Sequence, residues 1–288
     1  MKSFFTITLL CLSLPSMATH CKEEKTITHS FDADEISLLW VNALAGSLEI
    51  NGHNVNTVTV NARVCANELK YLEQMTIDVD ETGGQLDLTV IIPYKNIDWD
   101  ADYAFMDLEI MVPKNLSVKL KDSSGNLVVR DVNLNSVNDT SGDIRLTKIH
   151  GDLEINDSSG DIYVRETIGN VTIHDSSGRI DVRDVTGDVV IPRDSSGDID
   201  IDTVTGQVII ERDSSGSIRI KNVTKDVVIH NDSSGDIRIS LVQGSVRIGN
   251  DGSGNIRIAQ VDGDFTLDTK GSGNISTSRI KGKIELPR

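Results

Sequence analysis

The sequence predicts an all-β protein: a single-chain β-solenoid of about nine coils behind an N-terminal β-rich cap. Three observations support this fold class: a motif that recurs at a nearly constant interval, apolar residues that alternate with polar ones, and glycines that interrupt every nine or ten residues. Alternation with period two is typical of a half-buried strand. Because glycine is unfavourable inside helices, a helical repeat is excluded.

The repeat begins at residue 122, where the motif Asp-Ser-Ser-Gly-Asp-Ile first appears and then recurs with small changes. Its copies are 17 to 19 residues apart. A lone unit of this length cannot bury an apolar face, whereas stacked units cover one another. We therefore expect one solenoid coil per repeat. The recurring glycines are Gly125, Gly142, Gly160, Gly178, Gly197, Gly216, Gly235, Gly254 and Gly273.

Each full repeat carries five apolar, mostly β-branched positions that occupy matching columns. Such side chains suit a pleated, half-buried surface, so we expect the columns to point into the coil. Asp200, Arg219 and Arg238 alternate with them and should face water. One coil supplies Ile199, Ile201, Val204, Val208 and Ile210, and the next supplies Ile218, Ile220, Val223, Val227 and Ile229.

Residues 19–121 lack the full repeat and are predicted to form the cap, with the solenoid domain spanning residues 122–288. Gly83-Gly84 indicates a hairpin turn, and the polar, aromatic block 94–103 indicates a loop. The expected strands of the cap are Thr26–Phe31, Ile36–Val41, Ser47–Ile50, Val58–Val64, Met75–Val79, Leu86–Ile92, Leu108–Val112 and Leu116–Leu120.

Residues 1–18 have the organisation of a secretory signal peptide. Lys2 precedes an apolar stretch, and Ser16 and Ala18 place small residues at a cleavage site. The apolar stretch is too short to span a bilayer, which takes roughly 20 residues. An uncleaved N-terminal anchor is the alternative. The sequence predicts an exported protein, periplasmic or extracellular, with no transmembrane segment.

Export places the two remaining cysteines in an oxidising compartment. Cys11 leaves with the signal peptide, so Cys21 and Cys65 are predicted to form a disulfide that ties the mature N-terminus to the first strands. Two free thiols are the alternative. Neither cysteine lies in a CxxC or Cys/His cluster, which argues against a structural zinc site.

The chain is acidic, with a formal net charge of −16. An acidic protein is repelled by nucleic-acid phosphates and by anionic membrane surfaces, so neither is an expected partner. With 38% hydrophobic residues, the chain is also too apolar for a disordered acidic tail.

The Gly-Asp-Ile/Val-x-Val/Ile repeats, the leading strand block, Val112-Pro113 before the first repeat and the export signal resemble the bacterial "putative adhesin" β-strand-repeat family. The resemblance covers roughly residues 30–286. It implies a cell-envelope β-solenoid and supplies no catalytic residues. From the chain as a whole we expect a protein that binds, adheres or scaffolds, with a protein or polysaccharide partner and no cofactor.

Two columns of aspartates, one before and one after the recurring glycine, form a candidate calcium row. Stacked carboxylates repel one another, and a cation between coils would relieve the repulsion. The stronger interpretation is structural: an aspartate before Ser-Ser-Gly caps a turn by accepting backbone N–H groups. The calcium-binding nonapeptide of β-rolls is also missing from the sequence. The candidate calcium ligands are Asp157, Asp161, Asp175, Asp194, Asp198, Asp213, Asp232 and Asp236.

Two further columns should face outward. Val190, Ile209 and Val228 would place three branched apolar side chains together on one face, as an interaction patch for docking or dimerisation. Packing of the N-terminal segment over them, or simple strand preference, would explain them equally. The second column, an arginine ladder of Arg219, Arg238 and Arg257, could bind carboxylate or sulfate, or could simply offset the acidic turns.

An exported, non-catalytic binding, adhesion or scaffolding protein is therefore the predicted function. A carbohydrate-active enzyme of the β-helix type is the alternative from another class. The short, uniform coils favour binding, because β-helix enzymes usually build a cleft from longer loops and from aromatic residues that stack sugars. An ice-binding surface is disfavoured, since the stacked serines lie beside charged residues.

Overall fold

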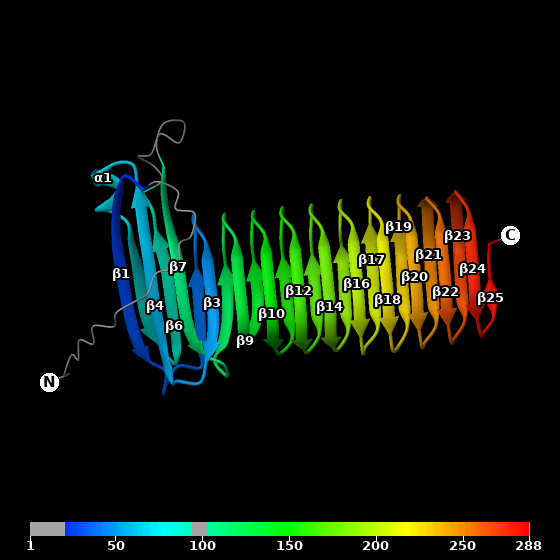
Figure 1. The fold of residues 1–288 in the computed structure, drawn as a ribbon, viewed down its shortest axis with the longest axis horizontal. Coiled ribbons are helices and arrows are strands. Elements are labelled where there is room, and N and C mark those ends of the chain that lie inside the picture. Colours follow the sequence, from blue (N-terminus) through cyan, green and yellow to red (C-terminus); the bar gives the residue numbers. More distant parts are fainter. Residues whose placement is uncertain (1–20, 94–102, 288) are drawn as a thin grey trace.

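The computed structural model describes residues 21–93 and 103–287. Figure 1 shows a long rod in which strands stack from the N-terminal region to the last coil. In this described part of the chain, no helix is long and apolar enough to cross a membrane. The predicted signal peptide, residues 1–18, and nearly all of the predicted loop 94–103 lie outside the described residues.

Two parallel sheets face each other along the rod, and each coil contributes one strand to each sheet. The all-β solenoid predicted from the sequence is confirmed. The first sheet holds β10 (Ile144–His150), β12 (Ile162–Ile168), β14 (Ile180–Thr186), β16 (Ile199–Val204), β18 (Ile218–Val223), β20 (Ile237–Val242), β22 (Ile256–Val261) and β24 (Ile275–Ile280). The second holds β11 (Leu153–Asn156), β13 (Val171–His174), β15 (Val189–Arg193), β17 (Val208–Asp213), β19 (Val227–Asp232), β21 (Val246–Ser253), β23 (Phe265–Ser272) and β25 (Ile284–Glu285).

The register places identical residues directly above one another. Ile199 pairs with Ile218, and Ile218 pairs with Ile237. These three side chains are fully buried, as are Val208 and Val227 in the second sheet. The inward columns predicted from the sequence are therefore confirmed. Their burial removes apolar surface from water, at roughly 25 cal/mol for each Å².

The recurring glycine is required by the closeness of the stacked turns. At Gly216 the backbone φ is +132°, and an added Cβ would lie 1.6 Å from the carbonyl oxygen of Gly197 in the preceding coil. No other residue fits such an approach between backbones. Gly197 and Gly216 are thus direct neighbours across coils.

Each coil also turns a corner at one residue with left-handed backbone. In the coil from Ile199 this residue is Thr203, with φ of 60°, and the next coil has Asn222, with φ of 57°. The corner interrupts the strict alternation, which explains why Ile201 and Val204, both buried, are three positions apart. The complete set is Asp131, Lys148, Glu166, Asp184, Thr203, Asn222, Leu241, Gln260 and Arg279.

The N-terminal region continues both sheets. Strand β9 (Leu127–Asn138) bends at Asp131, so its first half joins the first sheet and its second half joins the other. On its N-terminal side, β3 (Leu48–His53) pairs with the first half and β8 (Ser117–Lys121) with the second, both in parallel. Strand β2 (Leu38–Asn42) then pairs with β8.

Antiparallel strands close this end of the rod. In the first sheet, β7 (Ala104–Pro113) is followed by β4 (Thr57–Ala66) and β1 (Glu23–Asp32), which run in alternating directions. In the second sheet, β5 (Thr76–Thr82) and β6 (Gln85–Ile91) form the hairpin predicted at Gly83-Gly84. Helix α1 (Leu69–Leu72) was not predicted, because four residues are too few to show helical periodicity.

The C-terminal end of the rod is more open. Among the described residues, strands β24 and β25 each pair with only one neighbour. Ile284 and Leu286 in the last coil are 46% and 45% exposed, whereas Phe265 in the preceding coil is fully buried. The charged side chains of Lys281 and Lys283 flank this edge, and charge of this kind discourages pairing with another chain.

Candidate functional site

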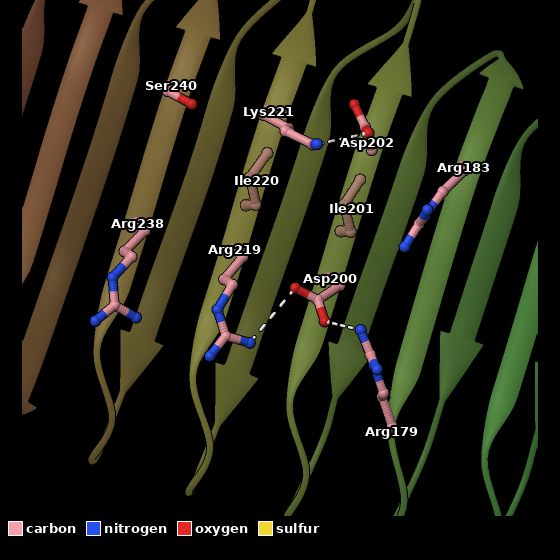
Figure 2. A pocket seen from close by; sticks show the side chains of 10 residues that line it. All are labelled: Arg179, Arg183, Asp200, Ile201, Asp202, Arg219, Ile220, Lys221, Arg238 and Ser240. Atoms are coloured by element: carbon pink, nitrogen blue, oxygen red, sulfur yellow. Dashed lines mark hydrogen bonds and ion pairs between the residues drawn. The ribbon is translucent and has the colours of Figure 1, made fainter.

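A shallow groove of about 300 Å³ runs over the first sheet, across β14, β16, β18 and β20. Figure 2 shows its charged side chains projecting from neighbouring strands while Ile201 and Ile220 form its floor. Five of its lining residues are cationic and two are acidic, although the chain as a whole has a net charge of −16. The charged lining residues are Arg179, Arg183, Asp200, Asp202, Arg219, Lys221 and Arg238.

The predicted arginine ladder forms part of this groove. Arg219, Arg238 and Arg257 occupy adjacent in-register positions, and Asp200 precedes them in the same column. An Arg219 amino group lies 3.0 Å from Asp198 Oδ2 and 3.5 Å from Asp200 Oδ1. The ladder is thus partly neutralised by carboxylates of the same face.

Asp181 gathers three arginines at one end of the groove. Its carboxylate accepts two hydrogen bonds from Arg165 and two from Arg183, while Arg179 lies 3.7 Å away. Burial would raise the pKa of Asp181, but the two hydrogen-bonded guanidiniums outweigh burial and hold the pKa below its usual value. Three guanidinium groups thus surround a single carboxylate.

Arg257 lies at the other end, in a second groove of about 290 Å³. It is exposed, and within the described residues it forms no ion pair, unlike Arg238, which pairs with Asp236 at 2.6 Å. Asn255, Asn274 and Ser276 line the same groove and offer uncharged hydrogen-bonding groups. An arginine beside amides and hydroxyls can bind an anionic group while its neighbours bind hydroxyl groups.

The two aspartate columns of the calcium prediction lie in different places. Asp157 and Asp175 are buried, and the Oδ1 atom of each accepts two backbone N–H groups from the next serines, at 2.6–3.2 Å. This bonding confirms the turn-capping interpretation. Asp194, Asp213 and Asp232 also cap their turns, and the Oδ1 atom of each accepts one backbone N–H, from the serine two residues on, at 3.1–3.2 Å.

The second column bridges coils instead. The Oδ1 atoms of Asp161, Asp198 and Asp236 each accept a backbone N–H from the following coil at 2.9 Å. Among the residues that the structure describes, no three acidic, histidine or cysteine side chains converge so that they could hold a metal ion. The calcium row stays a prediction, and its two columns do not form one site.

The predicted interaction patch lies on the opposite sheet. Val190, Ile209 and Val228 pair in register with one another and face outward, each partly exposed. Arg247 continues the column in the next coil, which limits the apolar stretch at that side. The patch stays a prediction.

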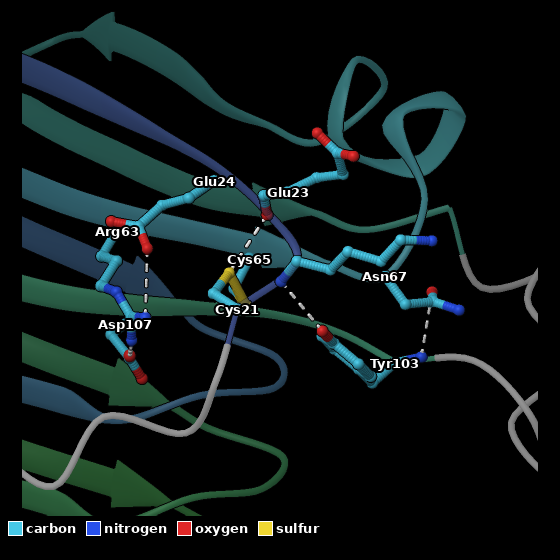
Figure 3. The surroundings of a disulfide bond; sticks show 9 residues. Cys21, Glu23, Glu24, Arg63, Cys65, Asn67, Tyr103 and Asp107 are labelled. Carbon is cyan, nitrogen blue, oxygen red and sulfur yellow. Dashed lines mark hydrogen bonds and ion pairs between the residues drawn. A yellow bond between two sulfur atoms is a disulfide. The ribbon is translucent and has the colours of Figure 1, made fainter.

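A disulfide joins Cys21 and Cys65, as Figure 3 shows. Arg63 lies nearby and forms ion pairs with Glu24 at 3.2 Å and with Asp107 at 3.4 Å. Together these contacts connect β1, β4 and β7. Their role is structural, because they lie at the capped end, away from the arginine groove.

Sequence reasoning missed two features of the charge distribution, one on the surface and one inside the rod. Arg179 and Arg183 join the groove although neither is part of the ladder column: Arg179 directly precedes β14, and Arg183 lies on β14 in register with Asp202. Lys270 pairs in register with Asp251 and thus takes the place of an aspartate in the inner column. The interval of 19 residues from Asp251 was a signal that could have identified it.

Comparison with known families settles the relationship of the chain. The family model Toastrack DUF4097 matches residues 32–285. The chain belongs to this family. The resemblance to the "putative adhesin" repeat family is thereby confirmed. No curated protein shows significant similarity to this family member.

Several solved structures are similar to this Toastrack chain. One is described as a "putative lipid binding protein" from Parabacteroides distasonis, with 16% identity, a TM-score of 0.46, and coverage of 91% of this chain and 97% of that one. A "putative adhesin" from Bacteroides fragilis has 11% identity, a TM-score of 0.39, and coverage of 92% and 98%. A "putative cell adhesion protein" from Clostridium sporogenes has 14% identity, a TM-score of 0.36, and coverage of 92% and 100%.

Proposed function

We propose that this protein is an exported, non-catalytic binding protein of the cell envelope, periplasmic or extracellular, whose ligand is an extended polysaccharide carrying carboxylate or sulfate groups. The observation that supports this most directly is the groove over the first sheet, where five cations face two carboxylates in a strongly acidic chain. Adhesion or scaffolding would follow from such binding.

The spacing of the cations suits a polymer. Arg219, Arg238 and Arg257 recur once per coil, roughly 4.8 Å apart along the rod. Each planar guanidinium can form two parallel hydrogen bonds to a carboxylate or sulfate. The existing pairs with Asp198 and Asp236 are partly exposed, and exposed ion pairs contribute about 0–1 kcal/mol. A ligand can therefore displace them at small cost.

Calorimetry with the mature protein, residues 19–288, tests the proposal. Polysaccharides with and without carboxylate or sulfate groups would be compared at low and high salt. We expect binding only to the anionic polymers, weakened by salt because screening reduces charge attraction. The double variant Arg238→Ala and Arg257→Ala should bind at least about tenfold more weakly, a loss of about 1.4 kcal/mol.

Arg247→Ala is the matched control, since Arg247 is an exposed arginine on the opposite sheet. It should bind as tightly as the wild type. Equal binding to neutral and anionic polymers, or equal weakening by both sets of variants, would contradict the proposal.

A different measurement distinguishes the proposed binding protein from a carbohydrate-active enzyme. Released reducing ends would be measured on the same polysaccharides. We expect none. Turnover that disappears in Asp200→Asn, a change of one carboxylate that lines the groove, would instead favour a carbohydrate-active enzyme.

A second surface, the apolar patch of Val190, Ile209 and Val228, is proposed to bind a second copy of the chain. Its support is that three branched side chains adjoin in register on a flat sheet. Replacing all three with Thr keeps the branching at Cβ and removes apolar surface. An oligomer in the wild type that becomes a monomer in the triple variant would support dimerisation through the patch. An unchanged oligomeric mass would contradict it.

A further inference from the structure

A column of aspartates runs inside the rod along the whole solenoid. Its eight members are at most 6% exposed. They belong to successive coils, and the register pairs Asp213 with Asp232 and Asp232 with Asp251. The column consists of Asp122, Asp139, Asp157, Asp175, Asp194, Asp213, Asp232 and Asp251.

One carboxyl oxygen of nearly every member lacks a partner. In members such as Asp157 and Asp213 the Oδ1 atom accepts backbone N–H groups of the serine turn, whereas Asp251 Oδ1 has no hydrogen-bond partner among the described residues. The Oδ2 atoms of seven members are buried and have no hydrogen-bond partner among the described residues. A buried carboxylate oxygen without a partner is costly, and the cost is relieved if that oxygen carries a proton and becomes a donor.

The eighth member is the exception. Asp251 Oδ2 lies 2.6 Å from Lys270 Nζ, and the side chains of this pair are 0% and 6% exposed. Lys270 occupies the next position of the same column and ends it with a positive charge. A buried carboxylate is thus matched with a buried cation at the one coil where the column stops. The other members have no such cation beside them in the described structure.

We propose that the seven inner aspartates other than Asp251 are largely carboxylic acids in mildly acidic solution, each directing its Oδ2 proton toward the carboxyl group of a neighbouring coil. The protonated column then joins the coils as a neutral seam, and base loosens the rod. The proton replaces the calcium ion as the occupant of this column. This proposal is independent of the polysaccharide groove, which lies on the outer face.

Charged groups outside the column affect the pKa values of its members at few positions. Repulsion by the carboxylate of Asp161 raises the pKa of Asp175, and repulsion by Asp198 raises that of Asp213, so both favour the protonated form. Lys270 is the cation that faces it, at Asp251. Repulsion between members of the column has the same effect, because the carboxylates of Asp213 and Asp251 both raise the pKa of Asp232.

The pKa values agree with the geometry. Burial raises the pKa of Asp213 to about 6 and that of Asp194 to about 7. Burial and the two neighbouring carboxylates raise the pKa of Asp232 to about 8. A raised pKa in the folded state means that the stabilisation is complete below the unfolded value near 3.8 and is lost as the pH rises through about 6 to 8.

Urea unfolding of the EDTA-treated protein at about pH 5 and about pH 8.5 tests the proposal. We expect the midpoint to fall with rising pH. In Asp213→Asn, whose amide donates a hydrogen bond at every pH, the midpoint should fall less. The pKa of Asp213 rises from 3.8 to about 6, so this residue alone changes the unfolding equilibrium constant by about a hundredfold in total, of which about tenfold falls between about pH 5 and about pH 8.5.

Asp236→Asn is the matched control. Asp236 belongs to the outer column, and a backbone hydrogen bond from Asn255 holds its pKa below the usual value, so it is ionised throughout the range. The variant should keep the pH dependence of the wild type. If Asp213→Asn does not fold, Asp122→Asn replaces it. Asp122 is the first member of the column, and burial raises its pKa to about 6.

Infrared spectra provide a readout independent of stability. The carbonyl stretch of a protonated carboxyl should be present at about pH 6 and weaker in Asp213→Asn. Three results would overturn the proposal: no such band, equal pH dependence in Asp213→Asn and Asp236→Asn, or a midpoint raised by millimolar calcium chloride, which would identify a cation as the occupant.

Discussion

The repeat region and the N-terminal region bury similar apolar side chains but arrange their strands differently. From residue 127 onward the coils stack in parallel with the same side chains in each layer. Before it, β1, β4, β5 and β6 introduce antiparallel pairing. A parallel stack of identical coils exposes an edge to which another coil could always be added. A change of direction, together with a short helix, ends it.

The comparison extends to the backbone. Non-glycine residues with positive φ start at Asp131 and then occur once per coil, whereas the described residues before it have none. In the solenoid, therefore, the backbone of every coil is bent at the same position. The cap instead uses a glycine hairpin at Gly83-Gly84 and a disulfide. Four variants test this difference between the cap and the solenoid, in order of decreasing expected effect.

The largest effect is expected from Gly216→Ala. Its Cβ would meet the Gly197 carbonyl oxygen, so the turn must shift in addition to adopting an unfavourable φ. We expect a loss of roughly 3–5 kcal/mol in the free energy of unfolding. Gly83→Ala in the cap is the control. It also has positive φ but no atom within 4 Å, so it should lose about 1 kcal/mol. Equal losses in urea unfolding would refute the close-approach argument.

Removal of the disulfide should act on the cap. Cys21 and Cys65 are separated by 44 residues, and opening such a loop costs roughly 3–4 kcal/mol in the chain-entropy model. In the double Ser variant, hydrogen exchange should quicken in β1 and β4 and stay unchanged in β16 and β18. Uniform acceleration along the rod would show instead that cap and solenoid unfold as one unit.

Lys270→Met tests the last position of the inner column. It leaves Asp251 buried without its cation, which should cost about 3 kcal/mol at neutral pH. Part of the loss should be recovered in acid, because Asp251 can then take up a proton. Lys281→Met breaks an exposed pair with Asp262 and should change stability by less than about 1 kcal/mol. A loss in Lys270→Met that is the same at acidic and neutral pH would contradict this explanation.

The smallest effect is expected from Thr203→Gly. Thr203 is a β-branched residue with φ of 60°, a conformation that costs roughly 1–2 kcal/mol for residues other than glycine. The variant should therefore gain about 1 kcal/mol in thermal or urea unfolding. Asn222→Gly, in the same position of the next coil, should gain less, because asparagine tolerates this conformation. A loss in Thr203→Gly would contradict the strain argument.

Much of the solenoid could be predicted because each of its contacts is repeated. Ile199, Ile218 and Ile237 occupy matching columns, and in-register stacking is the arrangement that buries them all. The same regularity predicted the arginine ladder and the turn-capping role of Asp157. The corner at Thr203 could not be predicted in the same way. Its backbone conformation depends on closing the coil, and the occupants of that position share no residue type.

The sequence by itself determined the period, the inward columns and the turn glycines, because spacing and residue type are local properties that repetition amplifies. Only the tertiary structure decided what depends on distance between coils. It brought Arg179 and Arg183 beside the ladder, paired Lys270 with Asp251, and isolated the Oδ2 atoms of the inner aspartates. Whether a carboxyl group is an ion or an acid depends on its desolvation and its neighbours, and these exist only after the coils have stacked.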